Sequence, residues 1–379
     1  MGKKINVGIL FGGKSVEHEV SLQSAKSVYD AMDREKYNPV LIGIDKSGRW
    51  LRGDGSHFLL HADDPKKISL NPSGNPVALI PQSRGSLSVL AAGIDTPAAG
   101  AVPEGLDVVF PILHGTFGED GTVQGLLKLA DIPFVGSSVL GSAVGMDKDV
   151  MKRLLRDAGI PVGKFLVLRA HDAGAIAFGE AAEVLGLPFF LKPANMGSSV
   201  GVFKVHDEAA YRAALTEAFS YDGKIILEEY IRGRELECSV LGNEEPMASV
   251  PGEVIVAHDF YSYDAKYLDE HGAALEIPAK IPEEVTTQVR SLALKTFRVL
   301  CGEGLARVDF FLRDGAVLVN EINTMPGFTK ISMYPKLWEA SGVSYTELID
   351  RLIELAIRRY EKERRLKTSY GGIQGASGV

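Results

Sequence analysis

Acidic and amide side chains recur at alternate positions in the segment 304–332, GLARVDFFLRDGAVLVNEINTMPGFTKIS. The pattern predicts two strands joined by a turn and followed by a Pro-Gly loop. Because side chains alternate between the two faces of a strand, Arg307 and Asp309 share one face of the first strand. For the same reason Glu321 and Asn323 share one face of the second strand. The segment therefore concentrates polar groups on one surface.

The turn at Arg313-Asp314-Gly315 decides whether the two carboxylates meet. Asp309 and Glu321 lie on the same face only if the connecting loop has an odd number of residues. A three-residue loop with Gly315 in the left-handed conformation supplies that number. With Asn323, the carboxylates then form a hard-oxygen site suited to Mg²⁺ that also holds phosphate oxygens. The alternative is a half-exposed hairpin with ordinary polar residues.

The segment 192–201, KPANMGSSVG, carries a second pattern with chemical meaning. Its small residues predict a loop whose backbone N–H groups can hold phosphate. Lys192, at the end of the preceding strand, can neutralise phosphate charge. The segment is not a Walker A loop, because the lysine precedes the glycines and no Gly-Lys-Ser/Thr follows. A plain flexible turn is the alternative.

Composition limits the class of protein. The chain has 379 residues, of which 45% are hydrophobic and 24% charged, which is typical of globular proteins and long enough for two or three domains. A net charge of −8 without a basic stripe argues against a nucleic-acid partner. Cys238 and Cys301 lack metal-ligand spacing, so we expect both to be buried thiols in a reducing compartment. No apolar run approaches the ~20 residues that cross a membrane, so we expect a cytoplasmic protein.

The N-terminal third predicts an α/β domain. Short apolar strands at 5–11, 40–45 and 107–115 alternate with helical segments, which favours a doubly wound, largely parallel sheet. Ligands bind such sheets at the carboxyl ends of the strands, where Glu17 and His114 fall. Two alternatives stay open at this stage: Glu17 favours a helix N-terminus electrostatically, and His114 is a buried histidine with protein partners.

Later segments predict a strand edge that could bind a nucleotide and a segment that could close over it. The strand 224–231 ends in Glu-Glu-Tyr-Ile and offers backbone groups suited to adenine, with Glu235 beyond it. The helix 148–158 marks the entry to a second domain. The tyrosine-rich segment 259–273 contains Lys266-Tyr267, which could close over a ligand. The alternative for that segment is a surface loop. We expect small strands of the first domain in 46–104.

These motifs resemble, in their order, those of the D-alanine–D-alanine ligases, ATP-grasp enzymes of peptidoglycan precursor synthesis. They are GGKSVEHEVSL, HGTFGEDG, MDK, KPANMGSSVG, EEYIRGRE, YDAKY, RVDF, NEINTMPGFT and the terminal Ser332. The resemblance extends from about residue 5 to residue 360, and the insertion at 46–104 resembles that of the longer-chain members of the family. It implies an α+β ATP-grasp fold with ATP between two subdomains. The expected parts are an N-terminal parallel-sheet substrate domain (1–145), a central subdomain (146–222), a C-terminal catalytic and metal subdomain (223–366) and a disordered tail (367–379).

The resemblance also implies roles for individual residues. Two Mg²⁺, or Mn²⁺ in their place, would bind Asp309, Glu321 and Asn323, in agreement with the strand pattern. Lysines would hold the phosphates of ATP, Lys266 would reach the γ-phosphate, Glu228 to Ile231 would line the adenine pocket and Glu235 would reach the ribose. The full set of expected ATP contacts is Lys148, Lys192, Ser199, Glu228, Glu229, Tyr230, Ile231, Glu235, Phe260, Lys266 and Asn320.

The expected substrate contacts follow in the same way. Glu17, near His114, would hold the ammonium group of the first D-alanine, and Ser198 and Tyr267 would form a hydrogen-bonded link to Glu17. Ser332 and Gly327 would hold the carboxylate of the second. The residues assigned to catalysis are Glu17, Ser198, Tyr267, Arg307, Gly327 and Ser332, with Arg307 and the Gly327 N–H stabilising the oxyanion.

The implied reaction has two steps. The first D-alanine carboxylate attacks the γ-phosphate of ATP to give an acyl phosphate, and the amine of the second then displaces phosphate. The family suggests a homodimer. One alternative is a ligase forming D-alanyl-D-lactate, against which the Tyr-Asp-Ala-Lys-Tyr pattern argues. Another is a nucleotide-binding ATP-grasp protein without catalysis, which would be expected to lack Arg307, a metal ligand or a phosphate lysine.

Overall fold

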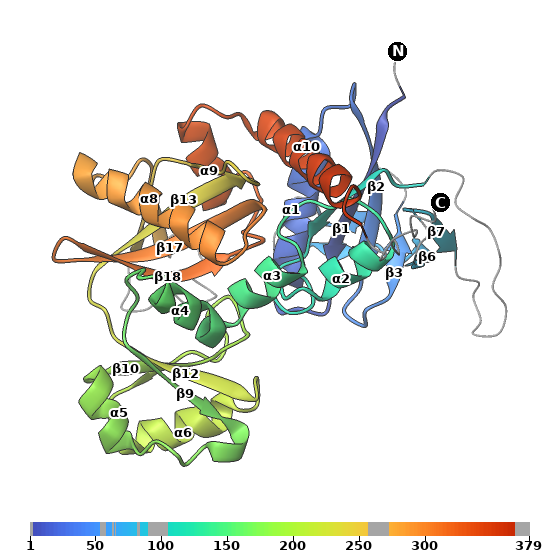
Figure 1. The fold of residues 1–379 in the computed structure, drawn as a ribbon. Coiled ribbons are helices and arrows are strands. Elements are labelled where there is room, and N and C mark those ends of the chain that lie inside the picture. The colour runs from blue at the N-terminus through green and yellow to red at the C-terminus, as the bar shows by residue number, and fades with distance from the viewer. Residues whose placement is uncertain are drawn as a thin grey trace, which may run out of the picture.

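Three large β-sheets organise the described part of the chain. Helices α3 (Val139–Met146) and α4 (Lys148–Asp157) connect the first sheet to the second, a short segment connects the second to the third, and Figure 1 shows the sheets as separate bodies. The α/β architecture expected from the sequence is confirmed. Within the described ranges, the helices are all too short or too polar to cross a bilayer. The computed structural model describes residues 3–53, 58–62, 64, 66–81, 84–89, 105–256 and 273–367.

The N-terminal sheet is mixed. Its strand order is β7-β6-β3-β2-β1-β8, in which β1 pairs in parallel with β2 and β8 and the other pairings are antiparallel. The antiparallel strands come from the segment 46–104, where the connections between β2 and β3 and between β6 and β7 are too short for a parallel crossover. The sheet is therefore less parallel than the sequence predicts. The strands are β1 (Ile5–Gly12), β2 (Tyr37–Ile44), β3 (Trp50–Arg52), β6 (Asn75–Leu79), β7 (Leu87–Val89) and β8 (Val108–Ile112), and β4 (Leu59–Leu60) pairs separately with β5 (Ser69–Leu70).

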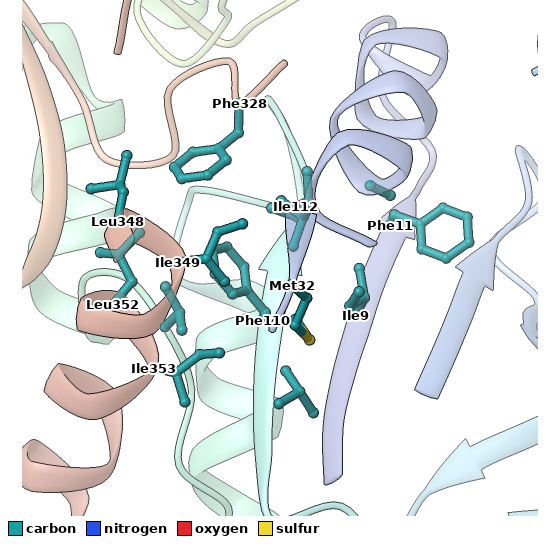
Figure 2. Packing of buried hydrophobic residues seen from close by; sticks show 14 of the residues in the cluster. Ile9, Phe11, Met32, Phe110, Ile112, Phe328, Leu348, Ile349, Leu352 and Ile353 are labelled. Atoms are coloured by element: carbon teal, nitrogen blue, oxygen red, sulfur yellow. The ribbon is translucent and has the colours of Figure 1, made fainter. Parts of the chain in front are cut away.

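Helices cover both faces of this sheet, as the doubly wound prediction requires. Helices α1 (His18–Ala31) and α10 (Tyr345–Glu363) pack in one hydrophobic cluster with the sheet, and α2 (Thr122–Leu129) packs in another. Figure 2 shows the buried side chains of α10 directed towards Phe110 of β8 and towards Phe328. Each fully buried side chain of this kind contributes about 1.5–3 kcal/mol. The C-terminal helix α10 thereby holds the N-terminal sheet against the Pro-Gly loop that contains Phe328.

The central sheet is antiparallel, in the order β11-β10-β12-β9. Helices α5 (Phe178–Leu185) and α6 (Glu208–Ala218) pack against it in one hydrophobic cluster. Strand β12, the last strand of this sheet in chain order, lies beyond residue 222, the expected end of this subdomain, so we propose the division after Glu229. The strands are β9 (Phe165–Arg169), β10 (Phe189–Pro193), β11 (Phe203–Val205) and β12 (Lys224–Glu229), and a short 3₁₀ helix η2 (Ala170–Asp172) follows β9.

The C-terminal sheet is also antiparallel, in the order β16-β15-β13-β17-β18, with β14 beside β13. Helix α8 (Glu283–Val299) packs on the face that carries Val308 and Phe310. Helix α9 (Met333–Ala340) follows the Pro-Gly loop. The opposite face carries the polar residues of the 304–332 segment. The strands are β13 (Arg234–Gly242), β14 (Met247–Ala248), β15 (Gly252–Val256), β16 (Ala273–Glu276), β17 (Gly304–Arg313) and β18 (Ala316–Asn323).

Arg359 of α10 joins the first and last domains. The buried guanidinium donates to the carbonyl oxygens of Phe134 (2.7 Å) and Gly136, lies 3.3 Å from Glu303 and sits over the Phe134 ring. Breaking such a buried charged network leaves carbonyl groups without donors, which is costly. Beyond Lys367, the tail expected to be disordered lies outside the described residues.

Candidate active site

The floor of the site is a row of acidic side chains across the C-terminal sheet. Strand pairing places Asp309 of β17 directly opposite Glu321 of β18, and Glu237 of β13 directly opposite Asp309. The neighbouring residues Val308 and Phe310 are buried in the core below. The surface that the sequence predicted for Asp309 and Glu321 is therefore present, and it contains one further carboxylate.

The turn that produces this arrangement differs from the expected one. Arg313 pairs with Ala316, so the loop has two residues, Asp314 and Gly315, both with positive φ. Such a two-residue turn alone would place the acids on opposite faces. A bulge corrects the register, because Phe310 pairs with Val319 while Asp309 pairs with Glu321, which leaves the intervening Asn320 as the extra residue. The expected three-residue loop is wrong, and the expected shared face is right.

The polar groups beside Asp309 fit a hard cation only in part. The Asn323 amide nitrogen donates to Asp309 at 3.0 Å, and Lys148 lies 3.8 Å from Glu321. Among the described residues, no cluster of three or more His, Cys, Asp or Glu side chains is arranged to hold a metal. Two carboxylates and one amide oxygen therefore leave the remaining ligand positions of Mg²⁺ to phosphate oxygens and water. The donor chemistry suits a metal that binds together with a nucleotide.

A cavity of about 560 Å³ lies between the central and C-terminal sheets. That volume is typical of small-molecule sites. Phe260 and Lys266, two of the expected ATP contacts, lie outside the described residues. Every expected ATP contact within the described ranges lines this cavity, namely Lys148, Lys192, Ser199, Glu228, Glu229, Tyr230, Ile231, Glu235 and Asn320.

A chain of opposite charges stiffens one wall of this cavity. Glu228 forms ion pairs with Lys192 and, at 2.7 Å, with Lys152, whose ammonium also donates to the Asn320 carbonyl at 3.0 Å. Burial raises the pKa of Glu228, but the two lysines overcome that effect and hold the pKa at about 2. Burial works against the charge of Lys192 too, yet Glu228 and Glu321 raise its pKa. Lys192 is therefore charged at neutral pH and suited to a phosphate. Sequence reasoning missed Lys152, although its i,i+4 spacing from Lys148 places both on one helix face.

Lys148 anchors the glycine-serine loop. Its ammonium donates to the Met196 carbonyl at 2.7 Å, and burial lowers its pKa. Ser198 and Ser199 both have positive φ, a conformation that costs energy for residues other than glycine. The loop is held at its base, where the backbone and side-chain nitrogens of Asn195 donate to Asp222 at 2.8 and 3.0 Å. The strained loop is thus held where it begins, at Asn195 and Met196.

The same loop reaches the N-terminal domain at Glu17. The Ser198 hydroxyl donates to Glu17, as the sequence predicted for this link. Two glycines crowd the carboxylate: a Cβ at Gly197 would lie 3.2 Å from Glu17 Oε2, and one at Gly115 would lie 2.7 Å from it. Gly115 also has a φ of +75°, so only glycine fits there without strain. Tyr267, the other expected member of the link, lies outside the described residues.

A second cavity of about 240 Å³ continues from the first. The two share lining residues that include Ser198, Glu235 and Glu321. The second cavity brings together every described residue that the sequence assigned to the substrates, to catalysis or to the metal, which are Glu17, His114, Ser198, Arg307, Asp309, Glu321, Asn323, Gly327 and Ser332.

His114 has protein partners at both ring nitrogens. Because a carbonyl oxygen only accepts, Nδ1 donates to Met325 (2.9 Å), and Nε2 then accepts from the Ser24 hydroxyl (3.2 Å). Burial lowers the pKa of the imidazole, which favours the neutral ring. Within the same cavity His114 therefore joins α1 to the Pro-Gly loop, and the two alternatives for this residue are not exclusive.

Ser332 lies at the start of α9. Its hydroxyl accepts from the Thr329 backbone N–H at 3.1 Å, and a Cβ at Gly327 would lie 3.2 Å from Ser332 Oγ. Helix N-termini carry partial positive charge and free N–H groups, which favour a carboxylate. The geometry fits the carboxylate of a small substrate at this end of the cavity.

Glu119 is a lining residue that sequence reasoning did not assign. It is buried and accepts from the Gly115 N–H at 3.1 Å. Burial, with a contribution from the charge of Glu17, raises its pKa to about 8. A protonated carboxyl beside Glu17 avoids a second negative charge in the same small cavity. Glu119 lies in the HGTFGEDG motif, but only the folded arrangement brings these two acids together, so the motif alone did not indicate this role.

Two family models account for most of the chain. The model described as "D-ala D-ala ligase C-terminus" matches residues 154–354, and the one described as "D-ala D-ala ligase N-terminus" matches residues 6–137. This chain belongs to the D-alanine–D-alanine ligase family. The first match contains the acidic row and most of the residues that line the larger cavity, and the second contains Glu17, His114 and Glu119.

Individual relatives agree with that assignment. A D-alanine–D-alanine ligase of Oceanobacillus iheyensis is 56% identical over 97% of this chain and 99% of its own length. The solved D-alanine–D-alanine ligase of Coxiella burnetii superimposes with a TM-score of 0.82 at 39% identity, over 96% of this chain and 97% of that one. The VanG D-Ala:D-Ser ligase of Enterococcus faecalis gives a TM-score of 0.81 at 34% identity, over 93% and 100% of the two chains.

Proposed function

We infer that this chain ligates two D-alanine molecules to D-alanyl-D-alanine with hydrolysis of ATP to ADP and phosphate, in the synthesis of peptidoglycan precursors. The observation that carries this inference is the continuity of the two cavities. A nucleotide-sized cavity lined by Lys148 and Lys192 opens, past the acidic row, into a smaller one lined by Glu17 and Ser332. The γ-phosphate end of a nucleotide and a small amino acid can therefore meet at the acidic row.

In the first step, the carboxylate of one D-alanine attacks the γ-phosphate, and the bond to the ADP oxygen breaks. Glu17 would hold the ammonium group of this D-alanine, because its carboxylate lies in the small cavity and is fixed by Ser198. Lys148 and Lys192 would neutralise phosphate charge. Phosphoryl transfer depends mainly on such positioning and charge neutralisation.

The acidic row would hold magnesium, or manganese in its place. Asp309, Glu321 and Asn323 would supply oxygen ligands, and phosphate oxygens and water would complete the shell. When bound, the metal ions would withdraw charge from the transferring phosphoryl group. Asn323 would have to turn its oxygen towards the metal, since its nitrogen donates to Asp309 in this structure.

In the second step, the amine of the other D-alanine attacks the acyl carbon, an amide bond forms and phosphate leaves. Arg307 and the Gly327 N–H would stabilise the oxyanion that develops at the carbonyl. A donor aimed at such an oxyanion lowers the activation barrier by about 3–4 kcal/mol. Ser332 and the N-terminus of α9 would orient the attacking D-alanine through its carboxylate.

The identity of the second nucleophile needs a direct test. VanG, named for D-serine, is a close structural neighbour, and the lid residues that argue against D-lactate lie outside the described ranges. The test is ADP release with D-alanine alone, with L-alanine, and with D-alanine plus D-serine or D-lactate, with the products identified by mass. We expect D-alanyl-D-alanine from D-alanine alone and as the main product of each mixture at neutral pH. A predominant D-alanyl-D-serine or D-lactate ester would contradict the proposed specificity, and ATP binding without turnover would favour the non-catalytic alternative.

We further propose a cytoplasmic homodimer. Cys238 and Cys301 are free thiols in the structure, which suits a reducing compartment. Cys238 is buried as expected, but Cys301 is exposed, so the expectation of two buried thiols is wrong for Cys301. Light scattering on the purified chain should give about twice the mass of 40.8 kDa. The monomer mass at micromolar concentration would contradict the dimer.

A further inference from the structure

Glu237 is the acid of the row that the proposed function leaves without a role. It lies on β13, directly opposite Asp309, which in turn lies directly opposite Glu321. Like charges directly opposite each other destabilise a sheet. At one end of the row, Lys148 lies 3.8 Å from Glu321. A cation is needed at the other end.

Arg307 supplies that charge. Its direct neighbours across the sheet are Ser239 and Asn323, so the guanidinium reaches diagonally towards the acidic row. Arg307 Nε lies 2.8 Å from Glu237 Oε2 and 2.7 Å from Asp309 Oδ1, and Nη2 lies 2.7 Å from Asp309 Oδ2. The exposed side-chain fractions are only 18% for Arg307, 11% for Glu237 and 14% for Asp309. The two hydrogen bonds from Arg307 to Asp309 are charge-assisted and therefore strong, and the Glu237 carboxylate forms an ion pair with the same guanidinium.

Asp309 would have to bind both Arg307 and the proposed metal ion. Both of its oxygens bind Arg307 in this structure, and one also accepts from Asn323. The proposed function requires the same oxygens for a metal. A carboxylate that binds Mg²⁺ gives up electron density and hydrogen-bond acceptor positions, so its hold on Arg307 weakens. Arg307 would have to stabilise the oxyanion while the metal is bound, that is, when its contact with Asp309 is weakest.

We propose that Glu237 is a positioning residue, which holds the Arg307 guanidinium in the reaction cavity while Asp309 serves the metal. This inference rests on the proposed function of Arg307 as an oxyanion donor. Glu237 suits the task because it contacts Arg307 at Nε, whereas Nη2 contacts Asp309, and because it lies on the side of Asp309 away from Glu321. A residue that only stabilised the sheet would have no coupling to Arg307 in turnover.

A double-mutant cycle between Glu237→Gln and Arg307→Met tests the proposal. We expect Glu237→Gln to lower kcat about tenfold or more, since a misplaced oxyanion donor acts on the transition state. The KM for ATP should change by less than about threefold. In the Arg307→Met background, Glu237→Gln should cause no further loss, because the two residues act as a unit. Glu237→Asp, which keeps the charge, should retain more activity than Glu237→Gln.

Two further measurements separate positioning from other roles. Binding of Mn²⁺ with ADP, followed by electron paramagnetic resonance and calorimetry, should be unchanged within about threefold in Glu237→Gln, because Glu237 is not a metal ligand in this account. Glu303→Gln serves as the matched control, since Glu303 pairs with Arg359 outside both cavities. Its kinetics should equal those of the wild type. If Glu237→Gln fails to fold in thermal melting, the same cycle is completed with Glu237→Asp.

The outcomes are distinguishable. Additive losses of kcat in the cycle, or wild-type kcat in both Glu237 variants, would overturn the positioning role alone. A loss of Mn²⁺–ADP binding as large as the loss of kcat would overturn it in favour of a metal role. Wild-type turnover by Arg307→Met would instead refute the proposed function of Arg307, and with it this inference.

Discussion

Replacing Glu228 with glutamine removes the negative charge that Lys152 and Lys192 share beside the nucleotide cavity. Lys152 lies 2.7 Å from Glu228, and the exposed side-chain fractions of the three residues are 3% for Lys152, 13% for Lys192 and 10% for Glu228. The variant keeps the shape of the side chain but leaves two ammonium groups facing each other in a poorly solvated wall. We expect a lower free energy of unfolding at neutral pH.

The pKa of Glu228 sets the magnitude and the pH window. Burial alone raises this pKa, and the two lysines reverse the effect, so that it falls from 4.5 to about 2. That fall corresponds to roughly 3 kcal/mol of stability. Because the folded pKa lies below the unfolded one, this contribution is complete above about pH 4.5 and is lost as the pH drops towards 2. The difference between wild type and variant should shrink over the same window.

The assay is urea unfolding of wild type and Glu228→Gln at pH 7, 5, 4 and 3, followed by circular dichroism. The control is Glu347→Gln on α10, whose ion pair with Arg351 is half exposed and should contribute less than about 1 kcal/mol at any of these pH values. A Glu228→Gln difference that is as large at pH 3 as at pH 7 would refute the reasoning. So would a difference at pH 7 no larger than that of the control.

Three further predictions concern other parts of the site and fold. Asp309→Asn should abolish ADP release while leaving the thermal melting midpoint near that of the wild type, and ordinary turnover at millimolar Mg²⁺ would contradict its metal role. Ser332→Ala should raise the KM of the second D-alanine about tenfold, equivalent to one lost hydrogen bond of about 1.4 kcal/mol, without changing ATP affinity. Equal losses for both ligands in that variant would contradict a role confined to the second subsite. Arg359→Met should lower the free energy of unfolding in urea by about 3 kcal/mol or more, because it leaves the Phe134 and Gly136 carbonyls without their donor. A loss below about 1 kcal/mol would show that the network contributes little.

Strand periodicity predicts which residues of the acidic row share a face within one strand, but not how the two strands are aligned with each other. Alternation along each strand correctly places Asp309 with Arg307, and Glu321 with Asn323. Whether the two strands present their acids on the same face depends on the turn and on the bulge at Asn320. The loop is one residue shorter than expected, and the bulge adds one residue to β18. The two differences cancel, so Asp309 and Glu321 share a face, as a three-residue loop would also have placed them. Sequence alone does not distinguish these two arrangements, since a bulge is set by pairing along the whole hairpin.

Residues that act through partners are harder to predict than residues in motifs. Lys152 and Glu237 did leave signals, because Lys152 shares a helix face with Lys148 and Glu237 alternates with Glu235. Glu119 lies in the HGTFGEDG motif, but its environment is created by the approach of Glu17 at the N-terminus of α1. The strained backbone of Ser198 and Ser199 was equally hidden. Neither residue type marks a positive φ, and the contacts that hold the loop lie at Asn195 and Met196, outside the two serines.

The most direct test of the ligase account uses D-alanine labelled with ¹⁸O in both carboxylate oxygens. One labelled oxygen of the first D-alanine attacks the γ-phosphate and leaves with it when the second amine attacks the acyl carbon. The account therefore predicts one ¹⁸O in each phosphate released, together with one D-alanyl-D-alanine that retains three labelled oxygens. Unlabelled phosphate, or ADP release without dipeptide, would show that water rather than the D-alanine carboxylate attacks ATP, and would contradict the ligase mechanism.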